Sequence, residues 1–325
     1  MGIIETLSAG FDRVTRHLWL ILIPALVDVA IWMGPRLSIS RLSQRAIAAL
    51  PSVQELGAQY QQSVAMFQDV LIDLGAGVNL LSLLSMRALG LRSLTGIAQP
   101  QSIPFAAAQR IIEMQSWSEL AATSVALTLL GLLIGCVFLS WIAQDVRDEG
   151  LSFPRTLQLS GRSWARLVAL GLAAALIVVA AVLAVSFGYT LLAVLSPQLA
   201  AVVMSLFAIA SLWLSAYASI VFFFTVRALF VSNMGVLRSV WSGLNILHRN
   251  FLSALGFLLL VYVIEAGLHY IWRELAVSIA GTLVGILGNA YISTGLVMAS
   301  FIFYRDRFVA WQDASRLALI NKGKL

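Results

Sequence analysis

Long apolar runs separated by short polar stretches dominate the pattern along this chain. Most of the runs approach or exceed the length needed to cross a hydrocarbon core, which is about 20 residues at a rise of about 1.5 Å per residue. The runs do not alternate apolar and polar residues, so they predict helices rather than the strands of a membrane barrel. Six spans are expected, at residues 18–32, 120–143, 167–195, 199–226, 251–272 and 277–304.

Three of these spans follow a segment with apolar residues at helical spacing and arginine near its end. Gly10 precedes Arg16 before the first span, and Gly243 precedes Arg249 at the same spacing before the fifth. Leu157, Gly161, Trp164 and Arg166 form a looser copy before the third span. Such amphipathic segments typically lie in the plane of the membrane interface. We therefore predict three repeats, each made of one interfacial amphipathic helix and two spans; the alternative is that any basic lead-in to a span has this pattern.

The first two spans are separated by residues 35–118, which predict a helical insertion outside the cytoplasm. Apolar residues at helical spacing from Val53 to Leu71 indicate an amphipathic helix. The next stretch, Val78 to Ala98, is apolar but is interrupted by Asn79, Arg87, Gly90 and Arg92. It is too polar for a comfortable span, so we expect an interfacial or re-entrant segment, or a helix packed over the spans. The insertion is expected to form a cap on a single membrane domain, residues 1–325.

Composition supports a membrane protein and excludes an ordinary soluble domain. Only 11% of the residues are charged and 60% are hydrophobic, with a mean hydropathy of +0.91, whereas soluble domains carry about 25% charged residues. The net charge of +6 is interpreted as basic flanks facing anionic lipid, and no nucleic-acid partner is expected. A single cysteine, Cys136, excludes an intramolecular disulfide framework.

The distribution of arginine predicts the orientation. Arginines gather between spans two and three, between spans four and five, and after span six, whereas the turn around Pro197 is uncharged. By the positive-inside rule both termini are expected in the cytoplasm of a bacterium, with the chain crossing its inner membrane several times. Arg36, Arg41 and Arg45 oppose this orientation, but they open a long loop, and long loops translocate largely regardless of charge. Asp28 interrupts the first apolar run, which is therefore expected to be a retained span rather than a signal peptide.

Five polar residues within the expected spans form the candidate site, because ionisable groups inside a membrane are costly and mark function by default. Glu265, His269 and Arg273 share one helix face, while Asp28 and Asn289 lie on other spans at a similar depth. We predict that these five side chains line a polar cavity opening outward under the insertion. The alternatives are a salt-bridged helix end and a structural pairing of Asp28 with an arginine of the insertion, Arg87 or Arg92. Gly281 and Gly285 have the four-residue spacing of a close helix contact.

No catalytic function is expected from the motifs. The sequence contains no phosphate-binding loop, zinc-protease motif, serine elbow, C-x-x-C pair or dinucleotide fingerprint. Two acids and one histidine can perform acid–base chemistry, but nothing positions a nucleophile or a metal. We therefore expect no catalytic residues, no metal and no cofactor.

The repeated pattern of surface helix, arginine and two spans, carried by Gly10–Arg16 and Gly243–Arg249, resembles uncharacterised bacterial six-helix membrane proteins. It is also similar to the membrane region of some glycerophosphodiester phosphodiesterases. The soluble catalytic domain of those enzymes is missing from this sequence, and no functional residue transfers. The resemblance implies an all-α polytopic helix bundle. The expected function is that of a non-enzymatic structural or accessory membrane subunit or membrane organiser, which meets lipid, partner membrane proteins or its own copies. The alternative is a small permease or lipid-handling protein.

Overall fold

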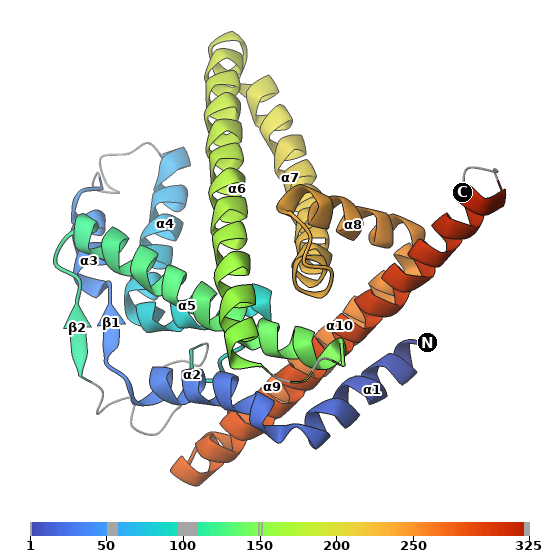
Figure 1. Cartoon of the computed structure of the whole chain (residues 1–325). Coiled ribbons are helices and arrows are strands. Elements are labelled where there is room, and N and C mark those ends of the chain that lie inside the picture. Colours follow the sequence, from blue (N-terminus) through green and yellow to red (C-terminus); the bar gives the residue numbers. More distant parts are fainter. Residues whose placement is uncertain (1, 51–57, 97–109, 149, 151, 322–325) are drawn as a thin grey trace. The chain divides into compact units, whose positions relative to one another are not determined.

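The computed structural model describes residues 2–50, 58–96, 110–148, 150 and 152–321, which fold mainly into helices (Figure 1). The described helices and strands are, in chain order, α1 (Ile3–Arg16), η1 (Leu18–Ile21), α2 (Leu22–Met33), β1 (Arg36–Ser38), α3 (Ser40–Ala48), α4 (Ala58–Gly77), η3 (Leu80–Leu84), η4 (Arg87–Leu89), β2 (Ile111–Glu113), α5 (Trp117–Val146), α6 (Phe153–Leu195), α7 (Pro197–Val231), α8 (Val236–Arg249), α9 (Phe251–Leu275) and α10 (Ile279–Asn321).

The helices confirm the predicted all-α, polytopic membrane bundle. Within the described residues, five helices are long and apolar enough to cross a membrane: α5, α6, α7, α9 and the Ile279–Trp311 part of α10. Two bent pairs raise the number to seven if each is one span. They are α1 with η1–α2, bent by 95°, and α4 with η3–η4, bent by 78°. Five of the six expected spans thus fall on long helices, and the first falls on the bent pair α1 with η1–α2.

The chain divides into two compact units. The first contains Met1–Thr6, Leu139–Leu258 and Ala299–Leu325, and the second contains Leu7–Phe138 and Leu259–Met298. The single membrane domain over residues 1–325 stays a prediction.

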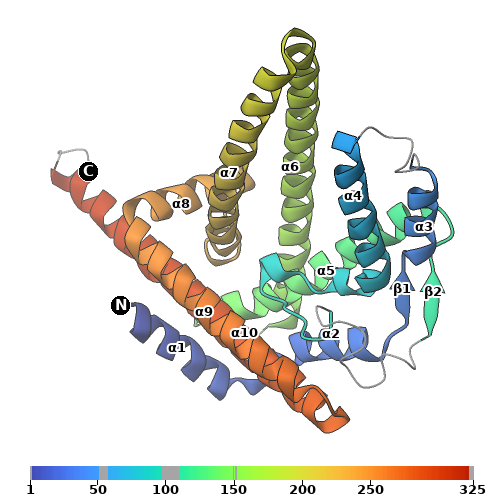
Figure 2. The ribbon, with the colours of Figure 1, turned by 180° about the vertical axis from the view of Figure 1, so that it is seen from behind.

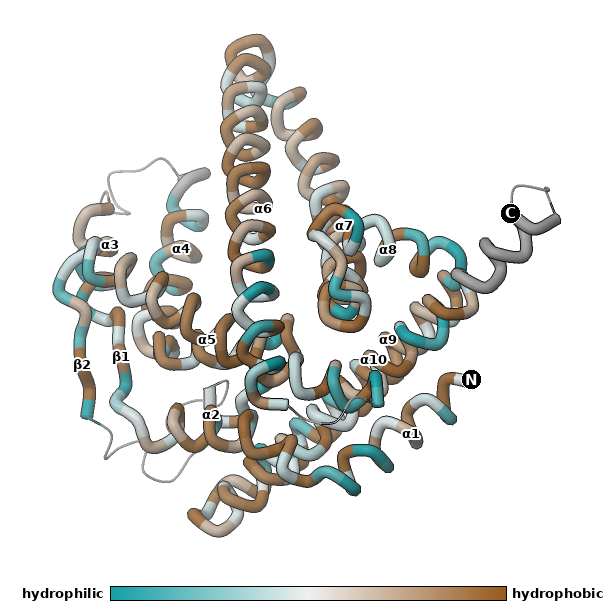
Figure 3. The backbone as a smooth tube through the Cα atoms, in the orientation of Figure 1, coloured by the Kyte–Doolittle hydropathy of each residue, from teal (hydrophilic) through white to brown (hydrophobic). Residues whose placement is uncertain are grey.

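In the first unit, α6 and α7 form a helical hairpin with long apolar stretches (Figure 3). The turn is built by Ser196 and Pro197. The Ser196 hydroxyl accepts a hydrogen bond from the Leu199 amide at 3.3 Å, and proline fits the first turn of a helix because its missing N–H has no partner there anyway. Along the apolar windows of the two helices 0% and 6% of the residues are buried. The apolar windows of the hairpin are therefore almost entirely exposed, whereas the residues of α7 from Phe224 to Phe230 are buried.

The three lead-in segments differ at the residue that joins them to their spans. His17 and Asn250 both leave the helical conformation, with φ of −126° at each and ψ of 59° and 34°. The corresponding residue before the third span, Leu167, stays helical, so the lead-in and the span form one 43-residue helix, α6. Leucine and the neighbouring Ala165 favour a continuous helix, whereas asparagine and histidine do so less. The interfacial helix predicted before the third span is therefore continuous with that span and not a separate helix.

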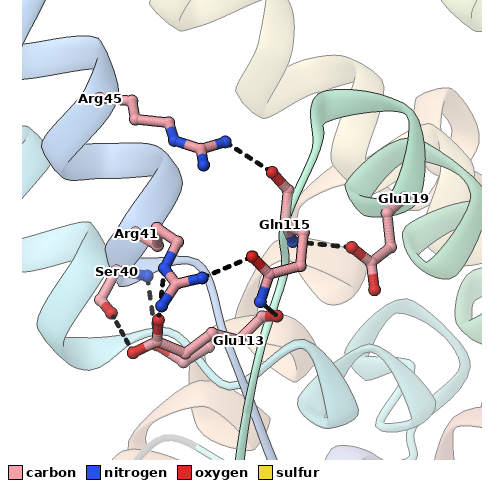
Figure 4. Close-up of polar contacts among 7 residues, drawn as sticks. Ser40, Arg41, Arg45, Glu113, Gln115 and Glu119 are labelled. Atoms are coloured by element: carbon pink, nitrogen blue, oxygen red, sulfur yellow. Dashed lines mark hydrogen bonds and ion pairs between the residues drawn. The ribbon is translucent and has the colours of Figure 1, made fainter.

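In the second unit, β1 and β2 close the two ends of the insertion. The strands pair in parallel, from Arg36 opposite Ile111 to Ser38 opposite Glu113, and they lie side by side in both views (Figures 1 and 2). Figure 4 shows the polar contacts that surround this junction. Arg41 pairs with Glu113 at 3.3 Å, and Arg45 donates a hydrogen bond to the Gln115 carbonyl at 2.6 Å. The chain therefore enters and leaves the insertion at one place.

Helix α4 covers most of the amphipathic helix predicted in the insertion. Val53 and Leu56, which belong to that prediction, lie outside the described residues. Val64 and Leu71 lie on the partly buried face of α4, whereas Phe67 is exposed. At Gly75 the backbones of α4 and α3 approach so closely that a Cβ atom would lie 2.9 Å from Ser43 Cβ. Helix α4 thus packs on α3 along this face.

Residues 78–96, which we call the inner hairpin, first run along α5. Val78 and Leu80 pack in a cluster with Leu120 and Leu127 of α5. Further along, a Cβ atom at Gly131 would lie 2.6 Å from the Leu83 carbonyl oxygen. At the far end, a Cβ atom at Gly135 would lie 2.5 Å from Leu89 Cδ1. The chain therefore advances along α5 from residue 120 to residue 135.

The inner hairpin then turns back along α10. Gly90 has a φ of 86°, a left-handed conformation that glycine adopts without a Cβ penalty, and a Cβ atom there would lie 2.2 Å from Val297 Cγ2. After the turn, Leu94 lies against Gly285 and packs with Ile286, which are close to the start of α10. The segment thus returns toward the helix ends at which it began. The interfacial, re-entrant and packed arrangements expected of it in a membrane stay predictions.

Candidate functional site

Asp28 holds the returning arm of the inner hairpin. This side chain on α2 is 1% exposed. Its carboxylate accepts hydrogen bonds from Ser93 Oγ at 2.5 Å, the Leu94 amide at 2.7 Å, the Thr95 amide at 3.0 Å and Thr95 Oγ1 at 2.6 Å. Oδ1 accepts three of these hydrogen bonds and Oδ2 accepts the one from Leu94, so both carboxylate oxygens are bound by the hairpin.

Asn289 holds the same arm from α10. Its Nδ2 donates a hydrogen bond to the Arg92 carbonyl oxygen at 2.8 Å. One helical turn earlier, Gly285 leaves room for Leu94, because a Cβ atom there would lie 2.9 Å from Leu94 Cδ2. At Gly281 a Cβ atom would lie 2.0 Å from the Leu275 carbonyl oxygen. Both predicted packing glycines thus lie at close contacts, one with the inner hairpin and one with the end of α9.

Glu265 of α9 pairs with the side chain of Arg92, the residue whose backbone carbonyl binds Asn289. The Glu265 carboxylate and the Arg92 guanidinium form an ion pair, with the Glu265 side chain 12% exposed and the Arg92 side chain 37% exposed. The ion pair stabilises the buried Glu265 carboxylate, because a lone carboxylate in an apolar environment is strongly disfavoured. Arg92 is therefore fixed at both its carbonyl oxygen and its side chain.

His269 and Arg273 continue the face of α9 beyond Glu265. His269 is half-buried, and Arg87, Arg92 and Arg273 are its cationic electrostatic neighbours, with Asp28 a weaker anionic one. Arg273 lies 3.7 Å from the Glu274 carboxylate and 5.5 Å from the centre of the Tyr270 ring. Both side chains of the Arg273–Glu274 pair are at least 50% exposed, so the pair contributes little.

The structure thus brings three of the five predicted residues, Asp28, Glu265 and Asn289, onto one segment, Arg92–Thr95. His269 has Arg92 and Asp28 as electrostatic neighbours, and Arg273 lies further toward the end of α9. The alternative reading of Asp28 was a structural pairing with Arg87 or Arg92. In the structure, the Asp28 carboxylate accepts hydrogen bonds from the three residues that follow Arg92, whereas Arg92 forms an ion pair with Glu265. The predicted outward-opening cavity stays a prediction.

Sequence reasoning missed Ser93 and Thr95. The available signal was a Ser-Leu-Thr stretch after an arginine, in a segment already judged too polar to be a span. Two hydroxyls and the backbone N–H groups of a turn can together bind a carboxylate. Among the described residues, no group of three or more His, Cys, Asp or Glu side chains is placed to hold a metal ion.

No protein-family model, curated protein or solved structure matches the chain. The resemblance to six-helix membrane proteins therefore stays a prediction. The case for a function rests on the contacts within the second unit.

Proposed function

We propose that this protein is a non-enzymatic structural or accessory component of the bacterial inner membrane. The observation that carries the proposal is that both Asp28 carboxylate oxygens accept hydrogen bonds from the inner hairpin. A catalytic or ion-carrying acid needs a free oxygen for its substrate or proton. Each Asp28 oxygen instead accepts at least one hydrogen bond from Ser93, Leu94 or Thr95, which suits a residue that fixes an irregular segment inside a helix bundle.

The three-repeat architecture is part of this proposal, and buried small residues in equivalent positions support it. Thr6, Thr156 and Ser239 open the three lead-in segments; a buried glycine or serine follows four residues later, and an arginine ten residues later. The four-residue partners are Gly10, Ser160 and Gly243, and the arginines are Arg16, Arg166 and Arg249. His17 and Asn250 add a shared break in the helix one residue after the arginine. A common register for hydroxyl, small residue and arginine is expected of repeats and not of unrelated lead-ins.

The proposed orientation places both termini in the cytoplasm and the insertion outside. Arg41 and Arg45, which oppose it in the sequence, are engaged with Glu113 and Gln115 at the base of the insertion. Only Arg41 has an acidic partner there, and these arginines open a long loop, whereas the arginines after spans two, four and six form the larger basic set. The positive-inside rule then favours the proposed side.

The proposed partners are membrane lipid, other membrane proteins or a second copy. The exposure of the apolar α6–α7 hairpin supports this, because such a surface must be covered by lipid or by protein.

A native extraction tests the accessory role. The tagged chain is released from its membrane by a copolymer that retains neighbouring lipid, and its complexes are weighed and identified by mass spectrometry. We expect a stable complex with one partner or with a second copy, which a denaturing detergent disperses. A chain recovered solely as a lipid-bound monomer contradicts the accessory role.

The second candidate is a lipid-handling protein or permease, favoured by the ion pair and histidine on one face of α9. Under this hypothesis Glu265→Gln abolishes transbilayer movement of a labelled lipid in proteoliposomes while the protein stays folded. If the wild-type chain moves no lipid faster than empty liposomes, this candidate fails.

A further inference from the structure

Strand β2 has one backbone edge that faces β1 and one that faces away. The Arg110 carbonyl accepts a hydrogen bond from β1 at 2.9 Å, and the Met114 amide donates one to β1 at 3.0 Å. Alternate residues of a strand direct their backbone groups to the same side. The N–H and C=O groups of Ile111 and Glu113 therefore point away from β1, and we call them the outer edge of β2.

The outer edge of β2 is largely unpaired, in contrast to that of β1. The outward Leu37 amide of β1 donates a hydrogen bond to Asn79 Oδ1 at 3.1 Å. Over the described ranges of the chain, the outer edge of β2 forms one hydrogen bond, from Gln115 Nε2 to the Glu113 carbonyl at 3.3 Å. Figures 1 and 2 show no described helix or strand on this side of β2. Such unpaired backbone groups are a template for another strand.

The side chains beside the outer edge also favour an added strand. Ile111 is 58% exposed and Ile112 is 38% exposed. Successive side chains of a strand point to opposite faces, so an added strand covers part of both isoleucines. Proteins commonly protect an open edge with lysine or proline, whereas β2 begins with these two exposed isoleucines. Branched apolar side chains stabilise a sheet through cross-strand neighbours.

Basic residues are in excess around this edge. Residues 36–45 and 110–119 contain four arginines and two glutamates. Glu113 pairs with Arg41 (Figure 4). The Arg110 side chain, directly before β2, is exposed and forms no hydrogen bond or ion pair with any residue that the structure describes. The charge surplus therefore favours an acidic partner.

We propose that the outer edge of β2 binds an extended acidic segment of a partner protein, which adds a third strand to the sheet. The added strand hydrogen-bonds to Ile111 and Glu113, covers Ile112, and places an acidic side chain beside Arg110. In strand addition the main-chain hydrogen bonds supply affinity and the side chains supply selectivity. The inference rests on the proposed accessory role and deepens it, because it assigns the surface that a partner uses and the chemistry of that partner.

Fluorescence anisotropy with the purified full chain in detergent micelles tests the site. The probe is a short labelled peptide of alternating valine and glutamate, and its charge control has lysine in place of glutamate. Both peptides favour an extended conformation because of their valines. The wild-type chain is expected to bind the acidic peptide about tenfold more tightly than the basic one, equivalent to about 1.4 kcal/mol.

Two variants test the backbone and the charge separately. Ile111→Pro removes an outward N–H and no donor to β1, because proline lacks an amide hydrogen. It should weaken binding of the acidic peptide about tenfold, whereas the matched control Ile111→Val keeps the amide and should bind like the wild type. Arg110→Gln should weaken binding about threefold, the size expected of an exposed ion pair.

Four results overturn the inference. They are no binding of the acidic peptide by the folded wild type, equal binding by Ile111→Pro and Ile111→Val, equal binding of the acidic and basic peptides, and a disulfide-linked dimer of Ile111→Cys in a Cys136→Ala background. The last result assigns the edge to a second copy. Thermal unfolding of each variant separates loss of the site from loss of the fold, and Arg110→Gln tests the site without altering the strand backbone.

These measurements are independent of the native extraction. A partner recovered by extraction from a chain that binds neither peptide leaves the accessory role in place and removes this site. Peptide binding by a chain that extraction recovers solely as a monomer has the opposite meaning. Failure of the accessory role and failure of the site are therefore distinguishable.

Discussion

At the scale of single residues, polar side chains hold an irregular backbone segment in place. Asp28 binds Ser93, Leu94 and Thr95 of the inner hairpin, and Asn289 binds the carbonyl of Arg92. A non-helical segment leaves backbone N–H and C=O groups without helical partners, and in lipid each of these costs several kcal/mol if left alone. The buried acid and amide supply the partners that water supplies in a soluble loop.

The first prediction concerns Asp28→Asn. The amide keeps one acceptor oxygen but turns an N–H₂ donor toward the hydroxyl and N–H donors of residues 93–95, so at least one buried donor loses its partner. We expect the free energy of unfolding to fall by about 2–4 kcal/mol, measured by denaturant titration in detergent. Asp69→Asn, on the exposed part of α4, is the matched control and should change it by less than about 0.5 kcal/mol. A fully stable Asp28→Asn protein would contradict a structural role for this acid.

The second prediction concerns the Arg92–Glu265 pair. A double-mutant cycle with Arg92→Gln and Glu265→Gln should give a coupling free energy of about 1 kcal/mol, because the arginine side chain is more than a third exposed. The double variant should lose less unfolding free energy than the sum of the losses in the two single variants. Strict additivity of the two substitutions would show that the pair does not act as a unit.

At the scale of elements, glycines decide how closely the inner hairpin approaches its neighbours. Gly131 and Gly135 of α5 meet the advancing arm, and Gly285 of α10 meets the returning arm. A side chain at Gly131 would collide with the hairpin backbone, and one at Gly135 or Gly285 would collide with a leucine side chain of the hairpin. Small residues allow the same close approach between membrane helices.

The third prediction concerns Gly90→Ala. The added Cβ atom would lie 2.2 Å from Val297 Cγ2, and alanine is strained at a φ of 86°. The variant should lose about 2–4 kcal/mol of unfolding free energy, measured by the same titration. Adding Val297→Ala removes the collision but not the strain, so it should restore only part of the loss. The control variant Gly77→Ala, with no atom within 4 Å of its Cβ position, should leave the unfolding free energy unchanged. A Gly90→Ala protein as stable as the wild type would contradict the left-handed turn at this residue.

The sequence was informative where a single element decides the outcome. Apolar length alone marked the long spans, and the charges Arg87 and Arg92 showed that residues 78–98 differ from a span. It was uninformative where partners are distant in sequence. Asp28 meets Thr95 at a separation of 67 residues, and two of its donors are backbone N–H groups that every non-proline residue carries. The continuity of α6 through Leu167 was also missed, because an amphipathic pattern does not reveal whether the helix bends where it ends.

At the scale of the whole molecule, we propose from the distribution of arginine that the chain crosses the membrane with its insertion on one side and its arginine-rich connections on the other. The paired strands β1 and β2 keep both ends of the insertion together. The inner hairpin then enters the bundle and leaves it on the insertion's side. The proposed accessory function depends on this layout.

Thiol labelling of intact cells tests this layout most directly. In a Cys136→Ala background, one cysteine replaces Gln62 on the exposed part of α4, and in a second protein one replaces Arg162 near the start of α6, which is also exposed. A membrane-impermeant maleimide should label the Gln62→Cys protein in intact cells, and the Arg162→Cys protein only after the membrane is opened. Labelling of Gln62→Cys solely from the cytoplasmic side, or of Arg162→Cys in intact cells, would contradict the account.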